Sequence, residues 1–423
     1  MRALGIAALV LALAAPAGAA PFGKSRTLGT TPPGYVYDFM FSTEGPRGGV
    51  AFFVAGEKQV GLTRMQRLYI ARVEGNGRTH ALTTTRVKGR TPARTYDGGP
   101  PYPYLTVGPR WRMLTTEVRP TGAYGVRLAP GGRRVAAQRL GPKASGIIRT
   151  NARGDAIGGF GDGFAIARSA GRFVRAPRAL RRYSTGLPRL TADGSLYDLR
   201  RTEDGSLAVA HSSGRRWGSA QSVFTAAPGR TVSYSDVVSS AGGDALLVYG
   251  IRDESSDTSL LVRFGRRGRP FGPPVELTAH ADPSSVAIEA IPGGRVAVRW
   301  MDRNRVLHLA RASGRGRRFR EVASWTAPEP VDFRTLLPLA DGRTLLAWAT
   351  EDRDFVKPDR LRAAVIDAKG RIGPAQTIAV ADREGELDGF ELRRLGANRA
   401  ALVWTELRKG KGAKRVRIAL TAR

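Results

Sequence analysis

Carboxylates gather in several polar segments of this sequence, each placed just after a run in which apolar residues alternate. Asp253 lies in "RDESSD", Asp302 in "MDRN", Asp352 in "TEDRDFVKPD" and Asp382 in "DREGELDG", and His280 shares "TAHADPS" with another aspartate. Carboxylates that converge on one site can bind a cation or act as the acid and base of a glycoside hydrolase. A His–Asp pair can transfer protons. The alternative is solvated loops, and neither acidic run that follows a second strand has the spacing of a calcium loop.

Other catalytic chemistry has no counterpart in the sequence. The chain has no cysteine, which excludes disulfides, thiol nucleophiles and thiolate metal sites. Its four histidines have no spacing typical of metal ligands, and no Gly-x-Ser-x-Gly elbow, phosphate-binding loop or zinc-protease motif occurs. We therefore expect no cofactor and no metal, and we assign no catalytic residue.

The elements that must position these residues form a repeat of about fifty residues. In the clearest copies, four short runs alternate apolar and polar residues and are separated by glycine-rich turns, as period-two strands require. The second run of each copy contains a large aromatic residue, at spacings of 51, 48 and 56 residues: Tyr249, Trp300, Trp348 and Trp404. These side chains could stack on sugars, but equivalent positions in a repeat more often pack between sheets. We expect them in the core.

Four antiparallel strands in every repeat, without a helical period, predict an all-β protein with a single β-propeller domain over residues 21–423. A four-stranded sheet with two apolar faces buries both only against neighbours in a closed ring. First strands that begin near residues 35, 102, 146, 187, 234, 285, 333 and 389 give eight four-stranded blades. Seven blades is the main alternative, because the copies between 95 and 185 are degenerate, and a pair of packed β-domains is another. A long loop is expected over 86–101.

The last copy has three strands, and its fourth is expected from the opposite end of the chain. The stretch "PFGKSRTLGT" near the N-terminus matches "PFGPPVELTA", which ends a repeat at 270–279. Residues 21–32 are therefore predicted to complete the C-terminal blade. Phe22 and Leu28 should be buried there, each contributing about 1.5–3 kcal/mol. The same pairing would remove sheet edges that invite aggregation.

The chain has a formal net charge of +32, and its basic residues are predicted to gather on one side of the ring. First-to-second and third-to-fourth turns share one end of the blades, here named the bottom face; the other loops share the top face. In the last four copies the bottom-face segments hold 3 acidic and 12 basic residues and the top-face segments 16 acidic and 9 basic. The bottom segments counted are 240–244, 265–270, 292–295, 312–320, 340–343, 367–372 and 396–399; the top ones are 251–257, 279–285, 301–304, 326–333, 349–359, 379–389 and 405–414.

Two explanations of this charge remain open. One explanation is genome composition, because GC-rich codons encode arginine more often than lysine. The other is functional, because basic residues attract a polyanion. Uneven placement favours an electrostatic role, since arginine can bind phosphate or carboxylate with two hydrogen bonds. The predicted polyanion-binding residues are Arg266, Arg267, Arg315, Arg317, Arg318 and Arg371.

The first twenty residues are predicted to be a cleaved signal peptide. Arg2 precedes an apolar run, and "AGAA" supplies the small residues of a cleavage site. The run is too short to cross a membrane, and no later stretch is long and apolar enough for a transmembrane segment. The mature chain is therefore expected to be secreted, extracellular or attached to the cell envelope.

The array of repeats resembles bacterial secreted β-propeller repeat proteins and, more loosely, the sialidase-like and WD40-like propellers. The resemblance covers nearly the whole mature chain. The Asp-box of sialidases is absent, as are the Trp-Asp dipeptides of WD40 repeats and glycine pairs in the kelch register. The resemblance therefore implies an architecture and no particular activity.

The expected function is non-catalytic binding of a ligand or partner by the top face, at Asp253, Asp302, Asp352, Asp382 and His280. The arginine-rich bottom face would attach the protein to an anionic envelope component or extracellular polymer. The alternative is a carbohydrate-active enzyme, a glycosidase or lyase, that acts on an acidic polysaccharide with the top-face carboxylates. Sequence-specific binding of nucleic acid is not expected, since no reader motif occurs. The oligomeric state is left open.

Overall fold

A computed structural model describes residues 21–421 of the chain with several gaps. The residues it describes are 21–34, 36–60, 63–92, 105–119, 122–141, 144–151, 153–160, 163–181, 188–240, 242–255, 257–266, 269–291, 295–313, 318–328, 331–350, 359–381, 385–408 and 413–421. The predicted signal peptide, residues 1–20, lies outside them. Within the described residues, no helix is long and apolar enough to cross a membrane.

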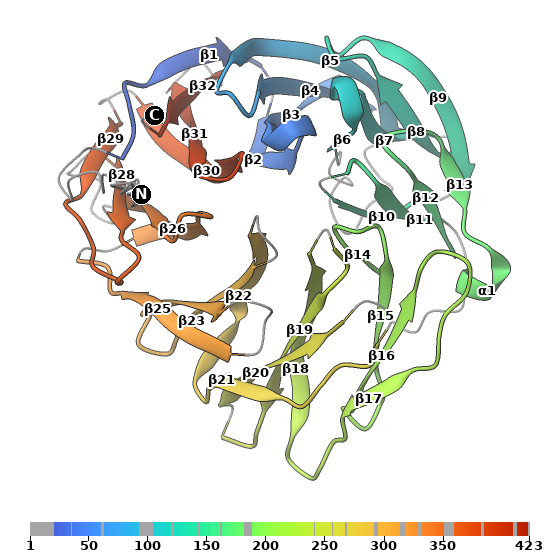
Figure 1. Ribbon diagram of the computed structural model, residues 1–423. Helices are drawn as coiled ribbons and strands as arrows, with labels where there is room; N and C mark the ends of the chain where they lie inside the picture. Colours follow the sequence, from blue (N-terminus) through green and yellow to red (C-terminus); the bar gives the residue numbers. More distant parts are fainter. Residues whose placement is uncertain are drawn as a thin grey trace, which may run out of the picture.

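Eight four-stranded antiparallel sheets stand around a central channel as the blades of a propeller (Figure 1). This confirms the predicted fold class and favours eight blades over seven. Within each of blades 1 to 7 the strands follow one another in sequence order from the channel to the outer wall.

The bounds of the first four blades are as follows. Blade 1 comprises β2 (Val36–Glu44), β3 (Val50–Val60), β4 (Thr63–Val73) and β5 (Thr79–Pro92); blade 2, β6 (Leu105–Val107), β7 (Met113–Arg119), β8 (Gly122–Leu128) and β9 (Arg134–Gly141); blade 3, β10 (Ala144–Thr150), β11 (Ala156–Phe160), β12 (Gly163–Ala167) and β13 (Phe173–Arg175); blade 4, β14 (Arg189–Leu190), β15 (Leu196–Arg201), β16 (Leu207–Ser212) and β17 (Gln221–Phe224). Three single turns of helix accompany them: η1 (Pro46–Gly48), η2 (Pro109–Trp111) and α1 (Arg178–Arg181).

The strands of the remaining four blades are together longer than those of blades 2 to 4, and shorter than those of blade 1. Blade 5 comprises β18 (Thr231–Ser239), β19 (Ala245–Arg252), β20 (Thr258–Gly265) and β21 (Val275–Thr278); blade 6, β22 (Ala281–Ile291), β23 (Arg295–Asp302), β24 (Leu307–Ser313) and β25 (Arg318–Trp325); blade 7, β26 (Val331–Pro338), β27 (Thr344–Thr350), β28 (Arg360–Ile366) and β29 (Gln376–Val380); blade 8, β30 (Gly385–Leu395), β31 (Arg399–Arg408), β32 (Ala413–Leu420) and β1 (Arg26–Thr30).

The two ends of the chain share blade 8, as predicted. β1 pairs antiparallel with β32, with Arg26 opposite Ile418 and Thr30 opposite Arg415. Figure 1 shows this blue strand beside the red strands of the C-terminus. Phe22 and Leu28 are buried, at 2% and 6% exposure, which confirms the expectation for both side chains.

The N-terminal segment is also bound to blade 7. The side chain of Gln376 on β29 accepts a hydrogen bond from the Phe22 amide at 2.9 Å and donates to the Phe22 carbonyl at 2.8 Å. The same clamp joins blades 4 and 5, where Gln221 holds both backbone groups of Phe271 at 2.7 and 2.8 Å. The two "PFG" segments thus occupy equivalent positions, each just before the fourth strand of its blade.

The core lies between the blades, and the middle strands supply most of it. Both faces of a middle strand are covered by neighbouring blades, so β19 is buried at seven successive positions. The aromatic side chains of the second strands are buried, as expected, and Trp348 packs against Trp325 of blade 6 with ring centroids 5.2 Å apart. Their exposures are Tyr249 1%, Trp300 2%, Trp348 2% and Trp404 0%.

The predicted loop over 86–101 is wrong in its first half. β5 runs to Pro92, and its pairing with β4 extends to the last residues, with Pro92 opposite Thr63. Threonine and valine are enriched in "TTTRVKGRTP", and these β-branched residues favour an extended strand. Residues 93–101 lie outside the described residues.

First-to-second turns bring neighbouring blades into backbone contact at the bottom face. Gly154 has φ 74°, and a Cβ atom there would lie 2.3 Å from the Gly108 Cα of blade 2. Only glycine combines this conformation with such a close approach. The turn between β10 and β11 therefore fixes the spacing of two blades.

Candidate functional site

The top-face aspartates that the structure describes organise their own turns. Asp253 Oδ1 accepts hydrogen bonds from the Ser255 hydroxyl at 2.7 Å and the Asp257 amide at 3.1 Å. The bond from Ser255 is the main reason that the pKa of Asp253 lies below its ordinary value. Asp302 Oδ1 accepts from the Val306 amide at 2.9 Å in the equivalent turn of blade 6. These bonds are typical of Asx turns and account for both residues without a ligand.

Asp257 is the top-face carboxylate that reaches a neighbouring blade. Its Oδ1 lies 2.7 Å from Arg303 Nη2 and 3.3 Å from His280 Nδ1. The hydrogen bond from His280 is the leading cause that lowers the pKa of Asp257. His280, predicted in a ligand site, is thus part of an exposed ion-pair cluster between blades 5 and 6.

His308 lies in a more enclosed cluster that the sequence analysis did not identify. Its ring stacks on Trp300, with centroids 5.2 Å apart and planes at 10°. Its nitrogens lie 3.3 Å from Asp302 Oδ2 and 3.0 Å from Glu321 Oε1. The register of the β23–β24 hairpin, in which Trp300 faces His308, is the sequence signal that could have revealed this pairing.

The other two predicted top-face residues, Asp352 and Asp382, lie outside the described residues. Among the residues that are described, no three His, Cys, Asp or Glu side chains form a cluster able to hold a metal ion. A third ion-pair cluster in the described part of the top face joins Glu406 to Arg415 and Arg417, at 3.5 and 3.2 Å. All three clusters are explained by contacts within a blade or with the next blade.

The predicted bottom-face arginines are described in part. Arg266 is exposed and begins the turn that leads to Phe271, its carbonyl accepting from the Arg269 amide at 2.8 Å. Arg371 is largely exposed, and its Nε lies 2.7 Å from Asp367 Oδ2 in the same turn. The backbone of Arg318 begins β25. The other predicted residues, Arg267, Arg315 and Arg317, lie outside the described residues.

Further bottom-face arginines bridge neighbouring blades. Arg295 of blade 6 donates to the Ala340 carbonyl of blade 7 at 2.8 Å, and Arg311 donates to the Gly342 carbonyl at 2.6 Å. Arg399 of blade 8 donates to a backbone carbonyl of blade 1 at 2.8 Å. Some of the arginines therefore hold neighbouring blades together, a role that the amino-acid composition alone could not indicate. Because carbonyl groups are neutral, these bonds do not themselves neutralise the three arginines.

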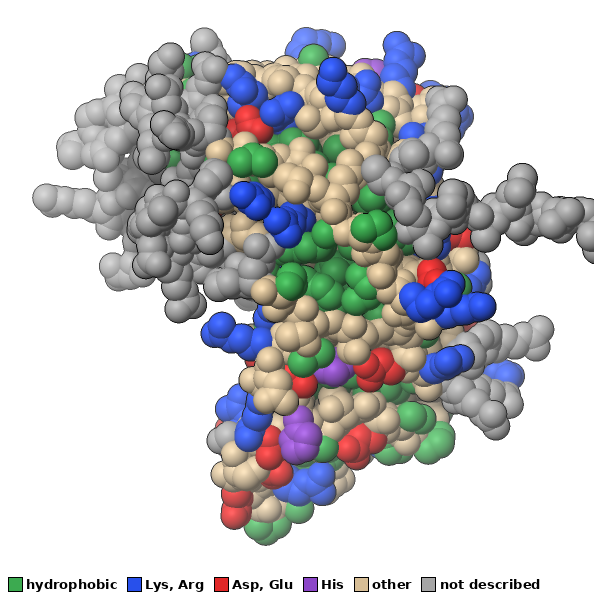
Figure 2. All heavy atoms as spheres, turned by 90° about the vertical axis from the view of Figure 1, so that its left-hand side faces the viewer, with side chains coloured by type: hydrophobic (Ala, Val, Ile, Leu, Met, Phe, Trp, Pro, Cys, Tyr) green, Lys and Arg blue, Asp and Glu red, His purple; other side chains and the backbone are tan. Residues whose placement is uncertain are grey.

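The outer wall carries charge in a less ordered way. Figure 2, which shows the side of the molecule at the left of Figure 1, has basic side chains in several separate places. Acidic and histidine side chains gather toward the lower part of this view. This wall therefore shows no single basic surface that would indicate a binding site for a polyanion.

The central channel contains two cavities that the sequence analysis did not anticipate. Both are lined by residues near the ends of first strands, next to the turns of the bottom face. The first has a volume of about 320 Å³ and the second about 380 Å³, and they share Thr150, Leu190, Val237, Val238 and Ile288. Each volume lies at the lower end of the range for small-molecule sites.

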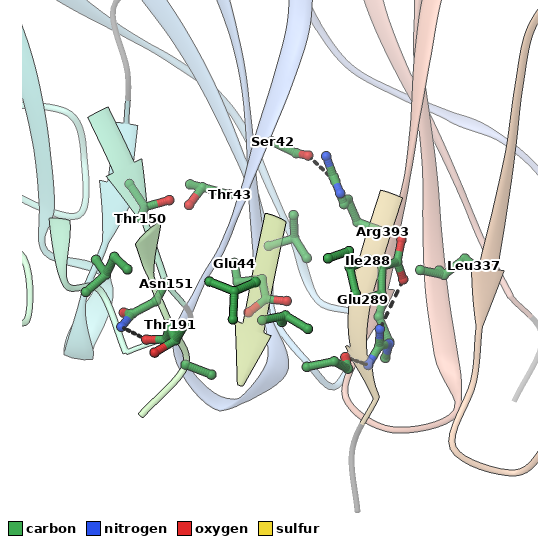
Figure 3. A pocket seen from close by; sticks show the side chains of 17 residues that line it. Ser42, Thr43, Glu44, Thr150, Asn151, Thr191, Ile288, Glu289, Leu337 and Arg393 are labelled. Atoms are coloured by element: carbon green, nitrogen blue, oxygen red, sulfur yellow. Dashed lines mark hydrogen bonds and ion pairs between the residues drawn. The ribbon is translucent and has the colours of Figure 1, made fainter. Parts of the chain in front are cut away.

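Polar side chains from opposite sides of the ring face the first cavity (Figure 3). The Asn151 amide donates to the Thr191 carbonyl at 2.8 Å on one side. On the other side, Arg394 Nη2 lies 3.4 Å from Glu289 Oε2. The adjoining Arg393 pairs with Glu391 at 2.9 Å and donates to the Ser42 hydroxyl.

The second cavity contains a different balance of charge. Its lining includes Arg149, Arg189 and Asp236. Arg189 Nε lies 2.6 Å from Asp236 Oδ1. Burial raises the pKa of the Asp236 carboxyl, and Arg189 opposes that rise. Paired charges and the Thr150 hydroxyl in such a space can bind a polar ligand, whereas no nucleophile–base pair is present among its described lining residues.

Comparison with known proteins assigns the chain to no family. No family model matches the chain, and no curated protein matches it significantly. A protein of unknown function from Dyadobacter fermentans is 13% identical, with a TM-score of 0.42 over 94% of this chain and 99% of that one. The polysaccharide lyase Uly1 is 8% identical, with a TM-score of 0.41 over 88% of each chain. The lectin SapL1 is 13% identical, with a TM-score of 0.33 over 74% of this chain and 94% of that one.

Proposed function

We propose that this protein is a non-catalytic binding propeller that is exported and attaches to an anionic polymer through its bottom face. The observation that carries the proposal is the coincidence of three features on that face. The arginine-rich turns, the arginines that bridge blades and both channel cavities all lie there. A polyanion lying across the ring would meet positive charge at the blade ends and at the channel mouth.

The charge on these arginines remains available to a ligand. A guanidinium group has five N–H donors, so a bond to one or two carbonyls leaves donors for phosphate or carboxylate oxygens. Arg295 and Arg399 are held in this way by the backbone of the next blade. Restrained side chains lose less conformational entropy when they bind, which favours association.

Binding to immobilised polyanions across a salt series tests the proposal. The variant replaces Arg266, Arg267, Arg315, Arg317 and Arg318 with glutamine. A control removes five charges from top-face segments, at Arg353, Lys357, Arg408, Lys409 and Lys411. Each lost ionic contact should reduce the slope of log affinity against log salt by about 1, as for phosphate contacts to nucleic acid. Equal slopes in the wild type, the variant and the control would refute the role of the bottom face.

The alternative remains a carbohydrate-active enzyme with top-face carboxylates, and one assay separates the two functions. The mature chain is incubated with acidic polysaccharides while reducing ends and unsaturated products are measured. Asp302→Asn is compared with Asp367→Asn, a bottom-face control. Turnover lost only in the top-face variant would favour the enzyme, whereas binding without turnover supports the binding propeller.

A further inference from the structure

Positive charge is concentrated in the channel where blades 3, 4 and 5 meet. Arg149 is the last residue but one of β10, Arg189 begins β14, and both line the second cavity. Arg201 lies beside them, since Arg189 and Arg201 both donate to Ser235, each at 3.4 Å, to its carbonyl and hydroxyl respectively. Asp236 is the one carboxylate among the described residues that line this cavity.

The single carboxylate does not balance these arginines. Asp236 is occupied by Arg189, at 2.6 Å. The Nε atom of Arg149 is buried and has no hydrogen-bond partner among the described residues. Burial is the main cause that lowers the pKa of Arg201, and repulsion from Arg189 adds to it. Among the described lining residues, two partly buried guanidinium groups, Arg149 and Arg189, share one carboxylate that is already paired with Arg189, which indicates a place for an anion.

The space beside these groups suits a small ligand. The second cavity has a volume of about 380 Å³ and includes the side chain of Thr150 next to Arg149. A guanidinium group matches a carboxylate or phosphate in plane and spacing, and a threonine hydroxyl can donate a further hydrogen bond. The Asp236 carboxylate could accept from a hydroxyl group of the same ligand.

We infer that the second cavity is an anion-binding site that holds one carboxylate or phosphate group of a small hydroxylated ligand, with Arg149 as its principal contact. Arg189 and Asp236 position the ligand from β14 and β18, the first strands of the next two blades. This inference goes beyond the proposed function, because it concerns an interior site for a single anionic group and not the exposed face that meets a polymer.

Calorimetric titration of the mature chain at fixed ionic strength tests the inference, with three probes. Glucuronate represents a carboxylated sugar, inorganic phosphate represents a free phosphate, and glucose is the uncharged control. Binding of glucuronate or phosphate, but not glucose, is expected, and the stronger of the two identifies the source of the anion. Arg149→Gln should weaken that binding about tenfold or more, since a charge-assisted hydrogen bond is lost.

A matched variant controls for total charge and folding. Arg139→Gln removes one exposed arginine from the outer strand β9 and should leave anion affinity unchanged. Arg149→Gln should melt near the wild-type temperature, because glutamine keeps a polar side chain at this partly buried position. Equal affinities in the two variants, or no anion binding by the wild type, would overturn the inference.

The failure of this inference can be told apart from failure of the proposed function. The five-arginine variant of the bottom face should still bind the small anion, and Arg149→Gln should keep the salt slope for the polymer. If Arg149→Gln instead abolished polymer binding and left small-anion binding intact, the interior site would be rejected.

Discussion

Removing the Phe22 side chain should open the closure of the ring. Phe22 is 2% exposed and packs in a cluster with Leu339, Leu402 and Trp404, so it joins the N-terminal segment to blades 7 and 8. Phe22→Ala deletes a buried ring while the backbone clamp by Gln376 remains. The perturbation therefore separates side-chain burial from backbone pairing.

The expected loss follows from burial and position. Truncation of a buried phenylalanine to alanine costs about 3–5 kcal/mol. A site near a chain end can relax into part of the cavity, so we expect about 3 kcal/mol for Phe22→Ala. Phe22→Leu keeps most of the volume and should cost about 1 kcal/mol. Gln376→Ala removes two hydrogen bonds to Phe22, each contributing about 1 kcal/mol.

Urea unfolding of the chain that begins at Pro21 measures these losses, with hydrogen exchange as a local readout. Amides of β1 and β32 should exchange faster in Phe22→Ala, whereas those of β19 in blade 5 should change little. The double variant Phe22→Ala with Gln376→Ala should lose less than the sum of the single losses, because the two residues touch.

A small effect would refute this account of ring closure. If Phe22→Ala lost less than about 1 kcal/mol with an unchanged dependence on urea, burial of this residue would not hold the ring together. The same conclusion would follow if exchange increased equally in blades 5 and 8.

Three further predictions concern the blade contacts. Gly154→Ala should lose about 2–4 kcal/mol in urea unfolding, because its positive φ and the adjacent blade exclude a Cβ atom, whereas Gly131→Ala, with open space, should stay within about 0.5 kcal/mol. Arg311→Met should lose about 1–3 kcal/mol by removing bonds to blade 7, and the exposed control Arg371→Gln should lose little. Burial acts to raise the pKa of Asp193, but hydrogen bonds from hydroxyl groups and a backbone amide lower it overall. Its stabilising effect should therefore be present above about pH 4 and be lost as pH falls through the lowered pKa, so Asp193→Asn should differ from wild type at pH 7 more than at pH 3.

The fold could be predicted because each repeat carries its own signal. Strand period, glycine turns and buried aromatics such as Trp300 and Trp348 recur at nearly fixed spacing, and the match between the "PFG" words revealed the closure. The far end of β5 was predicted as loop because Gly89 and Pro92, residues typical of turns, lie within it, although the β-branched run before them favours a strand. Blades 2 and 3 gave weak signals because strands such as β6 and β13 are only three residues long.

The site was harder to predict because it depends on contacts between repeats. Sequence placed Asp253 and Asp302 in equivalent turns, but whether they face a ligand or their own turn depends on side-chain direction. The pairing of Asp257 with Arg303 crosses from one blade to the next. Arg149 and Arg189 lie in the copies with the weakest repeat signal, so nothing in the sequence placed them beside one cavity.

The shared blade sets an order of events during synthesis. β1 is made first, and its partner β32 is made last, since Arg26 pairs with Ile418. At about 5–20 residues per second, the strand waits roughly 20–80 s for that partner. A strand that waits so long must not pair with other chains, and its short length, with Lys24 just before it and Arg26 as its first residue, suits it to remain single. In a chain truncated before β32, β1 would have no strand to pair with. Proteolysis of such unfinished chains should therefore begin at the incomplete blade 8.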